Sequence, residues 1–119
     1  MIHAYDKVYL SQAQSNLGIM LEFAVYDLEE DLTSFYQKFL QSELSSRFQN
    51  GESGVISGKS GIELAIEILK DETLGSKYRP SANRMPEYWC GWALAYFQWF
   101  SNLTFRNIDT LIPIDEILS

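Results

Sequence analysis

The side chains of this 119-residue chain that could do chemistry are few and scattered along it. Its one histidine is His3 and its one cysteine is Cys90. A nucleophile–base pair or a zinc site needs several such groups at set spacings. No two acids stand in an apolar setting that would tune their pKa values for general acid–base work. The sequence therefore predicts no catalytic residue, no metal site and no cofactor.

Two groups of acids have spacings at which a metal site could be suspected. Glu29, Glu30 and Asp31 are adjacent, whereas Glu63 and Glu67 stand one helical turn apart. No histidine follows either group at ligand spacing, and adjacent residues of a helix do not face one site. We expect the first group to cap and start a helix, and the second to be a solvated helix face.

The segment 51–61, GESGVISGKSG, contains the tripeptide Gly58-Lys59-Ser60, which also ends a phosphate-binding loop. That loop requires another glycine five residues before Gly58, where this chain has Ser53. Ser60 and Glu63 instead have the spacing of a capping box, which begins a helix. The segment is therefore interpreted first as a connection that ends in a helix cap.

A polar connector follows at 71–85 and contains the only basic cluster of the chain. Long loops on compact domains are often functional, and this one could clamp an anion. A small anion- or nucleotide-binding protein is therefore the second alternative function. The residues that would bind the anion are Lys59, Ser60, Lys77, Arg79 and Arg84.

The segment 86–105, PEYWCGWALAYFQWFSNLTF, contains all three tryptophans. Pro86 suits the first turn of a helix, where its missing N–H costs nothing. A helix that is apolar nearly all round belongs inside a bundle or in a membrane, and about 15 residues are short of the roughly 20 that a bilayer span needs. We therefore predict a central helix at 86–100 with its aromatic side chains in the core. The residues expected on one face of it are Trp89, Trp92, Ala93, Tyr96, Trp99 and Phe100.

Periodic apolar residues predict further helices at about 6–28, 32–48 and 62–70, and Thr104 is expected to cap a short helix that ends before Pro113. Gly18 interrupts the first helix, so either a neighbouring helix packs closely there or the helix bends. Asn50-Gly51 is typical of a left-handed helix stop. Together these patterns predict an all-α fold, a single-domain bundle of residues 1–119 with four to six helices.

Composition and charge restrict the class of partner. Hydrophobic residues make up 46% of the chain, enough for a core, and the formal net charge is −7. Binding to nucleic-acid phosphates requires the opposite sign, so nucleic acid is disfavoured as a partner. A lone cysteine allows no disulfide within the chain and fits a reducing compartment. With no signal peptide or membrane span expected, we predict a cytoplasmic protein.

A helix-turn-helix-like regulator is the first alternative function. A helix, a short polar break and a helix that opens at Thr104 have the outline of that motif. A recognition helix should present basic or amide side chains to base edges. Arg106 and Asn107 qualify, but Asp109 opposes them, which makes this alternative weaker than a protein-binding role.

Three phrases of the sequence resemble a family of small bacterial proteins. They are HAYD at residues 3–6, GKSGIELA at 58–65 and, most distinctively, EYWCGWALAYFQW at 87–99. That family occurs in short operons of Firmicutes and related bacteria, beside genes for a small helical protein and for a protein that resembles ADP-ribosyltransferases. The resemblance implies a toxin–antitoxin or phage-defence cassette. It implies no activity and no functional residues, so it assigns no site in this chain.

The leading hypothesis is a non-enzymatic protein–protein interaction module, an antitoxin-like inhibitor or accessory protein of a bacterial toxin or defence enzyme. Its partner is expected to be another protein, with the neighbouring transferase-like enzyme as a candidate. Acidic groups would face basic groups of that partner, and exposed aromatic side chains would anchor it. The residues predicted for this role are Glu29, Glu30, Asp31, Tyr88, Trp89 and Trp99.

Overall fold

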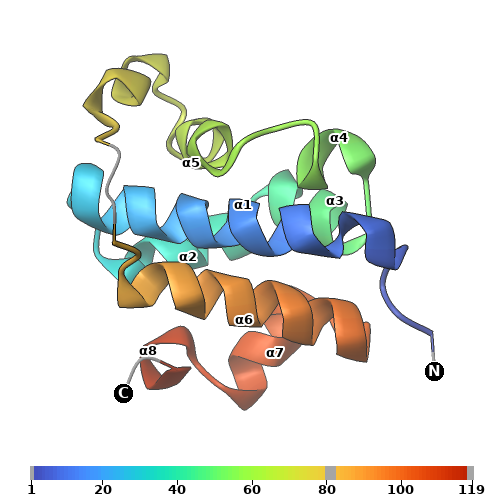
Figure 1. Cartoon of the computed structure of the whole chain (residues 1–119). Helices are drawn as coiled ribbons and strands as arrows, with labels where there is room; N and C mark the ends of the chain where they lie inside the picture. Colours follow the sequence, from blue (N-terminus) through green and yellow to red (C-terminus); the bar gives the residue numbers. More distant parts are fainter. Residues whose placement is uncertain (1, 80–82, 118–119) are drawn as a thin grey trace.

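The computed structural model describes residues 2–79 and 83–117, and within them the backbone is helical and contains no strand (Figure 1). The predicted all-α class is therefore confirmed. The chain is divided more finely than the four to six helices predicted, with eight α-helices in the described ranges. In order, the elements are η1 (Lys7–Tyr9), α1 (Leu10–Glu22), η2 (Phe23–Asp27), α2 (Leu32–Gln41), α3 (Glu43–Gln49), α4 (Ser53–Ile56), α5 (Gly61–Leu69), η3 (Glu72–Lys77), α6 (Pro86–Ser101), α7 (Phe105–Leu111) and α8 (Ile114–Ile117).

The helix at the centre of the fold is α1, which runs between α5 on one side and α6 on the other (Figure 1). Glycines allow both neighbours to touch its backbone. A Cβ at Gly91 of α6 would lie 2.6 Å from the Leu17 carbonyl oxygen. A Cβ at Gly61, the first residue of α5, would lie 2.7 Å from the Met20 nitrogen. Of the two explanations considered for Gly18, close packing holds, because a Cβ there would meet the Tyr88 carbonyl at 2.6 Å.

The predicted interior position of α6 needs correction, because only one face of this helix is buried. The buried side chains pack toward α1 and the rest of the core, and they are Cys90, Gly91, Leu94, Ala95, Gln98 and Trp99. The opposite face carries exposed large side chains: Trp89, Trp92, Tyr96, Phe97 and Phe100. Of the residues predicted to share one face, only Trp99 is buried. A helix that is apolar all round has no periodic contrast that could reveal which face packs inward.

Two predicted helices are interrupted. The first, expected over 6–28, consists of the 3-10 turn η1, then α1, then the π-helical segment η2, in which the Leu28 N–H bonds to the Phe23 carbonyl at 3.1 Å. The second, expected over 32–48, breaks at Ser42, which has extended backbone angles. The Ser42 hydroxyl donates to the Phe39 carbonyl at 2.6 Å. Serine side chains can replace backbone partners in this way, so they favour helix ends.

The predicted helix caps are confirmed. Ser60 and Glu63 form both hydrogen bonds of a capping box at 3.1 Å, and α5 begins immediately afterwards. The Thr104 hydroxyl accepts from the Asn107 N–H at 3.1 Å and starts α7. Gly51 has the left-handed φ of +78° expected of a helix stop. These local signals depend on neighbours in sequence, which explains why they could be predicted without the fold.

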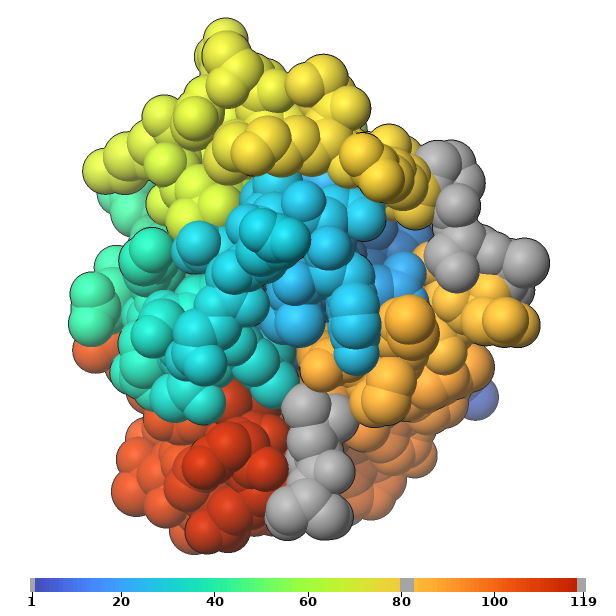
Figure 2. All heavy atoms as spheres, turned by 90° about the vertical axis from the view of Figure 1, so that its left-hand side faces the viewer, coloured from blue at the N-terminus to red at the C-terminus, as the bar shows by residue number. Residues whose placement is uncertain are grey.

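The end of the molecule at which α1 passes into η2 shows the layering directly. There, residues of α1, η2 and α2 are packed between η3 above and α6, α7 and α8 below (Figure 2). The helix α6 packs on α1, whereas α7 and α8 pack on α2 and lie beside α6. The exposed side chains of α6 are those that neither α1 nor the short helices cover.

Candidate interaction surface

The most unusual surface feature is a set of large aromatic side chains on the outer face of α6. We call Trp89, Trp92, Tyr96, Phe97 and Phe100 the α6 aromatic surface; each is 40–54% exposed. Four of them follow the spacing i, i+3, i+7, i+11, which places them along one side of the helix. At about 150–250 Å² per aromatic side chain, their exposed area is on the order of 400 Å². That is within the range of the largest apolar patch on a typical monomeric protein, and such a patch is often functional.

The rings of this surface support one another. Trp89 and Trp92 meet edge to face, with ring centroids 6.1 Å apart. Tyr96 and Phe100 are stacked with centroids 6.0 Å apart. Such contacts restrict the rotamers of side chains that solvent alone would leave mobile. The surface is therefore partly ordered before anything binds to it, which lowers the entropic cost of binding.

A groove of about 290 Å³ lies along α6 where α7 and α8 face it, and its lining is almost entirely apolar. It is lined by Trp92, Ala93, Leu94, Tyr96, Phe97, Ile108, Ile112 and Ile117. On α7, Leu111 is also apolar and 66% exposed. The groove and the α6 aromatic surface are continuous, because they share Trp92, Tyr96 and Phe97.

The sharp turn after α6 places α7 against this groove. Asn102 ends α6 with a left-handed φ of 57°. The buried Gln98 then donates its side-chain N–H to the Leu103 carbonyl at 2.9 Å. The Phe105 N–H, at the start of α7, donates to the Gln49 side-chain oxygen at 2.8 Å. These hydrogen bonds return the chain along α6, so that Ile108 and Ile112 form the far wall of the groove.

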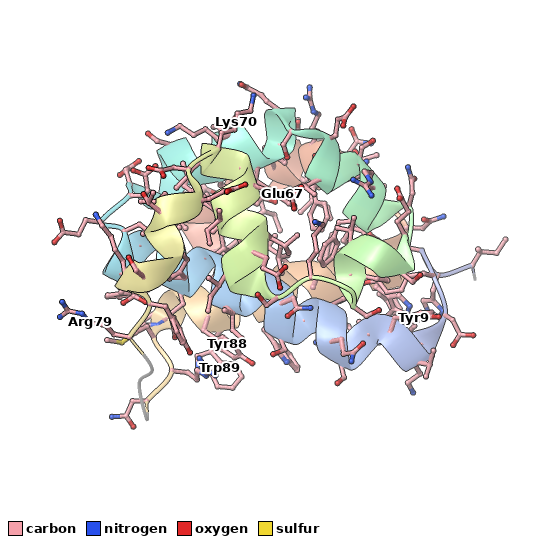
Figure 3. All side chains as sticks on the ribbon, turned by 90° about the horizontal axis from the view of Figure 1, so that it is seen from above. Tyr9, Glu67, Lys70, Arg79, Tyr88 and Trp89 are labelled. Carbon is pink, nitrogen blue, oxygen red and sulfur yellow. The ribbon has the colours of Figure 1, made fainter. Side chains whose placement is uncertain are left out.

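Of the three aromatic residues predicted to bind a partner, the structure places only Trp89 on the surface. Trp99 is 6% exposed, and its indole N–H donates to the Tyr5 carbonyl at 2.7 Å. The ring of His3 stacks on that of Trp99 with centroids 4.0 Å apart. Tyr88 is half-buried, and the Arg84 guanidinium lies 4.6 Å above its ring centre. Tyr88 and Trp89 lie together at one edge of the molecule, opposite Glu67 and Lys70 (Figure 3).

The predicted acidic residues lie on the connection between η2 and α2, which contributes no residue to the groove. The Asp31 side chain accepts from the Ser34 N–H at 3.0 Å and caps α2. Glu30 forms an ion pair with Lys38 at 3.3 Å. Glu29 has a left-handed φ of 58° and is exposed. The first two side chains thus stabilise local structure, as their position before a helix suggested.

The candidate anion-binding residues are spread over three places, each with a carboxylate nearby. Lys59 pairs with Glu67 at 2.8 Å. Arg84 pairs with Glu22 at 3.0 Å. The two remaining cations, Lys77 and Arg79, line a surface hollow together with Asp27 and Glu29. The Ser60 hydroxyl already accepts a hydrogen bond in its capping box. Residues 80–82 of the polar connector lie outside the described residues.

The short helix α7 offers little for reading DNA. Arg106, its one basic residue, donates from Nε to the Leu40 carbonyl on α2 at 3.1 Å. The Asp109 carboxylate accepts from the side-chain amide of Gln37, which is also on α2, at 3.2 Å. Both side chains therefore face α2, and α7 has seven residues. A recognition helix requires base-reading side chains directed away from the core.

Burial makes the single thiol of the chain unreactive. Cys90 lies on the buried face of α6 at 3% exposure, and burial raises the pKa of its thiol to about 12. Within residues 2–79 and 83–117, no three His, Cys, Asp or Glu side chains are grouped closely enough to hold a metal ion. No helix in these ranges has both the length and the apolar character that a bilayer crossing requires.

The chain matches no protein-family model, no curated protein and no solved structure. Sequence reasoning missed Trp92, Tyr96, Phe97 and Phe100 as surface residues. The signal that could have revealed them is the number of large aromatic side chains on one helix, which exceeds what a single packed face can bury.

Proposed function

We propose that this protein is a protein-binding module whose docking surface is the outer face of α6 together with the adjoining groove. The observation that carries this proposal is the combined exposure of Trp89, Trp92, Tyr96, Phe97 and Phe100. Tryptophan and tyrosine are, with arginine, the residues most enriched at the energetic centres of protein interfaces. Their exposure to water is unfavourable by itself, so burying them against a partner would be a source of binding free energy.

The polar atoms of this surface also suit an interface. The indole N–H groups of Trp89 and Trp92 make no hydrogen bond within the described residues, whereas that of Trp99 donates to Tyr5. Exposed indoles therefore offer a partner both apolar area and a donor. The resemblance to proteins of toxin–antitoxin-like operons suggests a bacterial toxin or defence enzyme as the partner. In that case the module would act as an antitoxin-like inhibitor or accessory protein.

The test compares proteins retained from the native host by the wild-type chain and by a groove variant, Trp92→Ala combined with Phe97→Ala. Val8→Ala serves as the control, because Val8 is 73% exposed on η1, outside the surface. A captured protein is then purified and its affinity for each form is measured. We expect the groove variant to bind about tenfold to a hundredfold more weakly, as for interface hot spots, with the control unchanged.

Circular dichroism of both variants checks that they remain folded. Equal affinities of the wild-type chain and a folded groove variant would contradict the proposal. If the partner is an enzyme, its activity in the presence of each form distinguishes an inhibitor from an accessory protein. The milder variant Trp89→Ala, at a residue outside the groove lining, provides a second measurement should the double variant unfold.

A further inference from the structure

The shape of the docking surface suggests the secondary structure of the partner segment that would bind there. From Trp89 to Phe100 the exposed stripe of α6 spans three helical turns, roughly 17 Å at 1.5 Å per residue. The groove runs beside the same stripe, with α6 as one wall and residues of α7 and α8 as the other. An apolar groove between helices is the geometry in which an amphipathic helix places its apolar face.

A partner cannot bind the outer face of α6 through hydrogen bonds between backbones. A partner that adds a β-strand needs an unpaired sheet edge, and the described residues contain no strand. The backbone of α6 is already hydrogen-bonded within the helix, so its outer face offers side chains only. A segment that binds by side chains alone must satisfy its own backbone, which an α-helix does.

The charges around the groove determine which helix fits. Residues 86–117, which form all of its walls, include four acids and one base: Glu87, Asp109, Asp115, Glu116 and Arg106. Arg106 and Asp109 both bond to α2, through the Leu40 carbonyl and the Gln37 amide, so neither is counted for the groove. Asp115 is exposed on α8, the helix that supplies Ile117 to the groove lining. Because Asp115 and Glu116 are both exposed on α8 and the whole chain has a net charge of −7, we expect the potential beside the groove to be negative.

We propose that the groove of α6, α7 and α8 accepts an amphipathic helix of another protein, whose apolar residues enter the groove and whose flanking residues are lysines and arginines. This inference rests on the proposed function and specifies its partner. A second copy of this chain fits less well, because it would bring the same acids to the same interface, and like charges placed together oppose association.

The experiment uses three synthetic peptides, each with a fluorescent label at one end, so that the anisotropy of the label reports binding to every form of the protein. The first is an amphipathic helix of about five turns, roughly 18 residues, with a leucine-rich face and lysine flanks. The second has glutamate in place of each lysine. The third has the composition of the first in a scrambled order without an apolar face. Titrations are made with the full chain at two salt concentrations.

We expect the basic amphipathic peptide to bind at least about tenfold more tightly than the other two, and to weaken as salt is raised. The protein variant Asp115→Lys should weaken its binding about threefold to tenfold. Glu72→Lys is the matched control, because it makes the same charge change on η3, on the side of α1 away from α7 and α8 (Figure 1). The groove variant should abolish most of the binding.

Each other outcome overturns the inference in a distinct way. Equal binding of the basic and scrambled peptides would indicate non-specific charge attraction. Equal binding of the basic and acidic peptides would show that the acidic residues of the protein do not contribute to binding. Sedimentation that shows a dimer lost in the groove variant would assign the surface to a second copy. If no peptide binds while the groove variant still loses a captured partner, the helix inference fails and the proposed function stands. If neither effect occurs, both fail.

Discussion

Single glycines decide how closely the layers of this protein approach one another. Gly91 of α6 lies against the backbone of Leu17 and Gly18, and Gly61 of α5 lies against α1 on its other side. Backbone atoms cannot move aside as a flexible side chain can, so a methyl group at these positions must push a whole helix outward. The same reasoning separates these glycines from Gly54, where a Cβ would have nothing within 4 Å.

Gly91→Ala should destabilise the fold, because its Cβ would come within 2.6 Å of the Leu17 carbonyl oxygen. We expect a loss of about 2–3 kcal/mol in the free energy of unfolding, the usual scale of overpacking. Gly54→Ala in α4 is the matched control and should be neutral or stabilising by up to about 1 kcal/mol. Urea denaturation of both variants measures the difference; equal midpoints would contradict the close approach of α6 to α1.

Cys90 should be inert in the folded protein and should link stability to alkaline pH. Because burial raises the pKa of its thiol from 9.0 to about 12, folded Cys90 keeps its proton at pH values where the unfolded chain loses it. Its contribution to stability is therefore complete below pH 9 and is lost as the pH rises toward about 12. The free energy of unfolding should fall over this range, and less steeply for Cys90→Ala.

The measurement is a series of urea titrations at several pH values, combined with thiol labelling at pH 8. We expect labelling of Cys90 to be at least about a hundredfold slower in the native protein than in urea, since the reactive thiolate is suppressed and buried. Equal labelling rates in the native and the unfolded protein would show that Cys90 is exposed. That result would also contradict the burial of the face of α6 on which Cys90 lies.

At the scale of elements, helix caps can be predicted from the sequence, whereas contacts between distant segments cannot. The capping box that starts α5 involves two residues three apart, and the loop before it is held by Asn16, whose side chain donates to the carbonyls of Ile56 and Lys59 at 3.0 Å each. The cap could be foreseen from the sequence, whereas the Asn16 contacts join residues forty or more positions apart. No pattern along the chain indicates such pairs.

Ser60→Ala should lower the free energy of unfolding by about 0.5–2 kcal/mol, the usual cost of losing a helix N-cap side chain. The reason is that the Glu63 N–H would lose its acceptor, the Ser60 hydroxyl at 3.1 Å. The second bond of the capping box, from the Ser60 N–H to the Glu63 carboxylate, would then no longer be supported by the first. Ser11→Ala, at an exposed position inside α1, serves as the control and should change stability by no more than about 0.5 kcal/mol. Thermal unfolding followed by circular dichroism checks both values.

At the scale of the whole molecule, net charge and the exposed aromatic side chains act against each other. A charge of −7 keeps copies of the chain apart at neutral pH, while the α6 aromatic surface favours their association. The balance between these two forces depends on pH, because protonation of carboxylates removes the repulsion without removing the apolar surface.

Solubility should therefore pass through a minimum near the isoelectric point of about 4.5. The minimum should be shallower for the groove variant Trp92→Ala with Phe97→Ala, and unchanged for Val8→Ala, since only the first removes part of the continuous apolar surface. Turbidity measured against pH at fixed protein concentration tests this. Identical curves for the three proteins would show that the α6 aromatic surface does not drive association.

The sequence by itself determined the all-α class, the start of α5 at its capping box and the start of α6 at Pro86, because each depends on local chemistry. At Gly18 it left close packing and a bend as alternatives, and the structure decided for close packing. The sequence also indicated that residues 86–100 matter most, from their aromatic content. It could not place Trp89, Trp92, Tyr96, Phe97 and Phe100 outside and Trp99 inside, since every face of that helix is apolar. Only tertiary structure decided this, because α1 packs on one side of α6 and the short helices α7 and α8 leave its outer face uncovered.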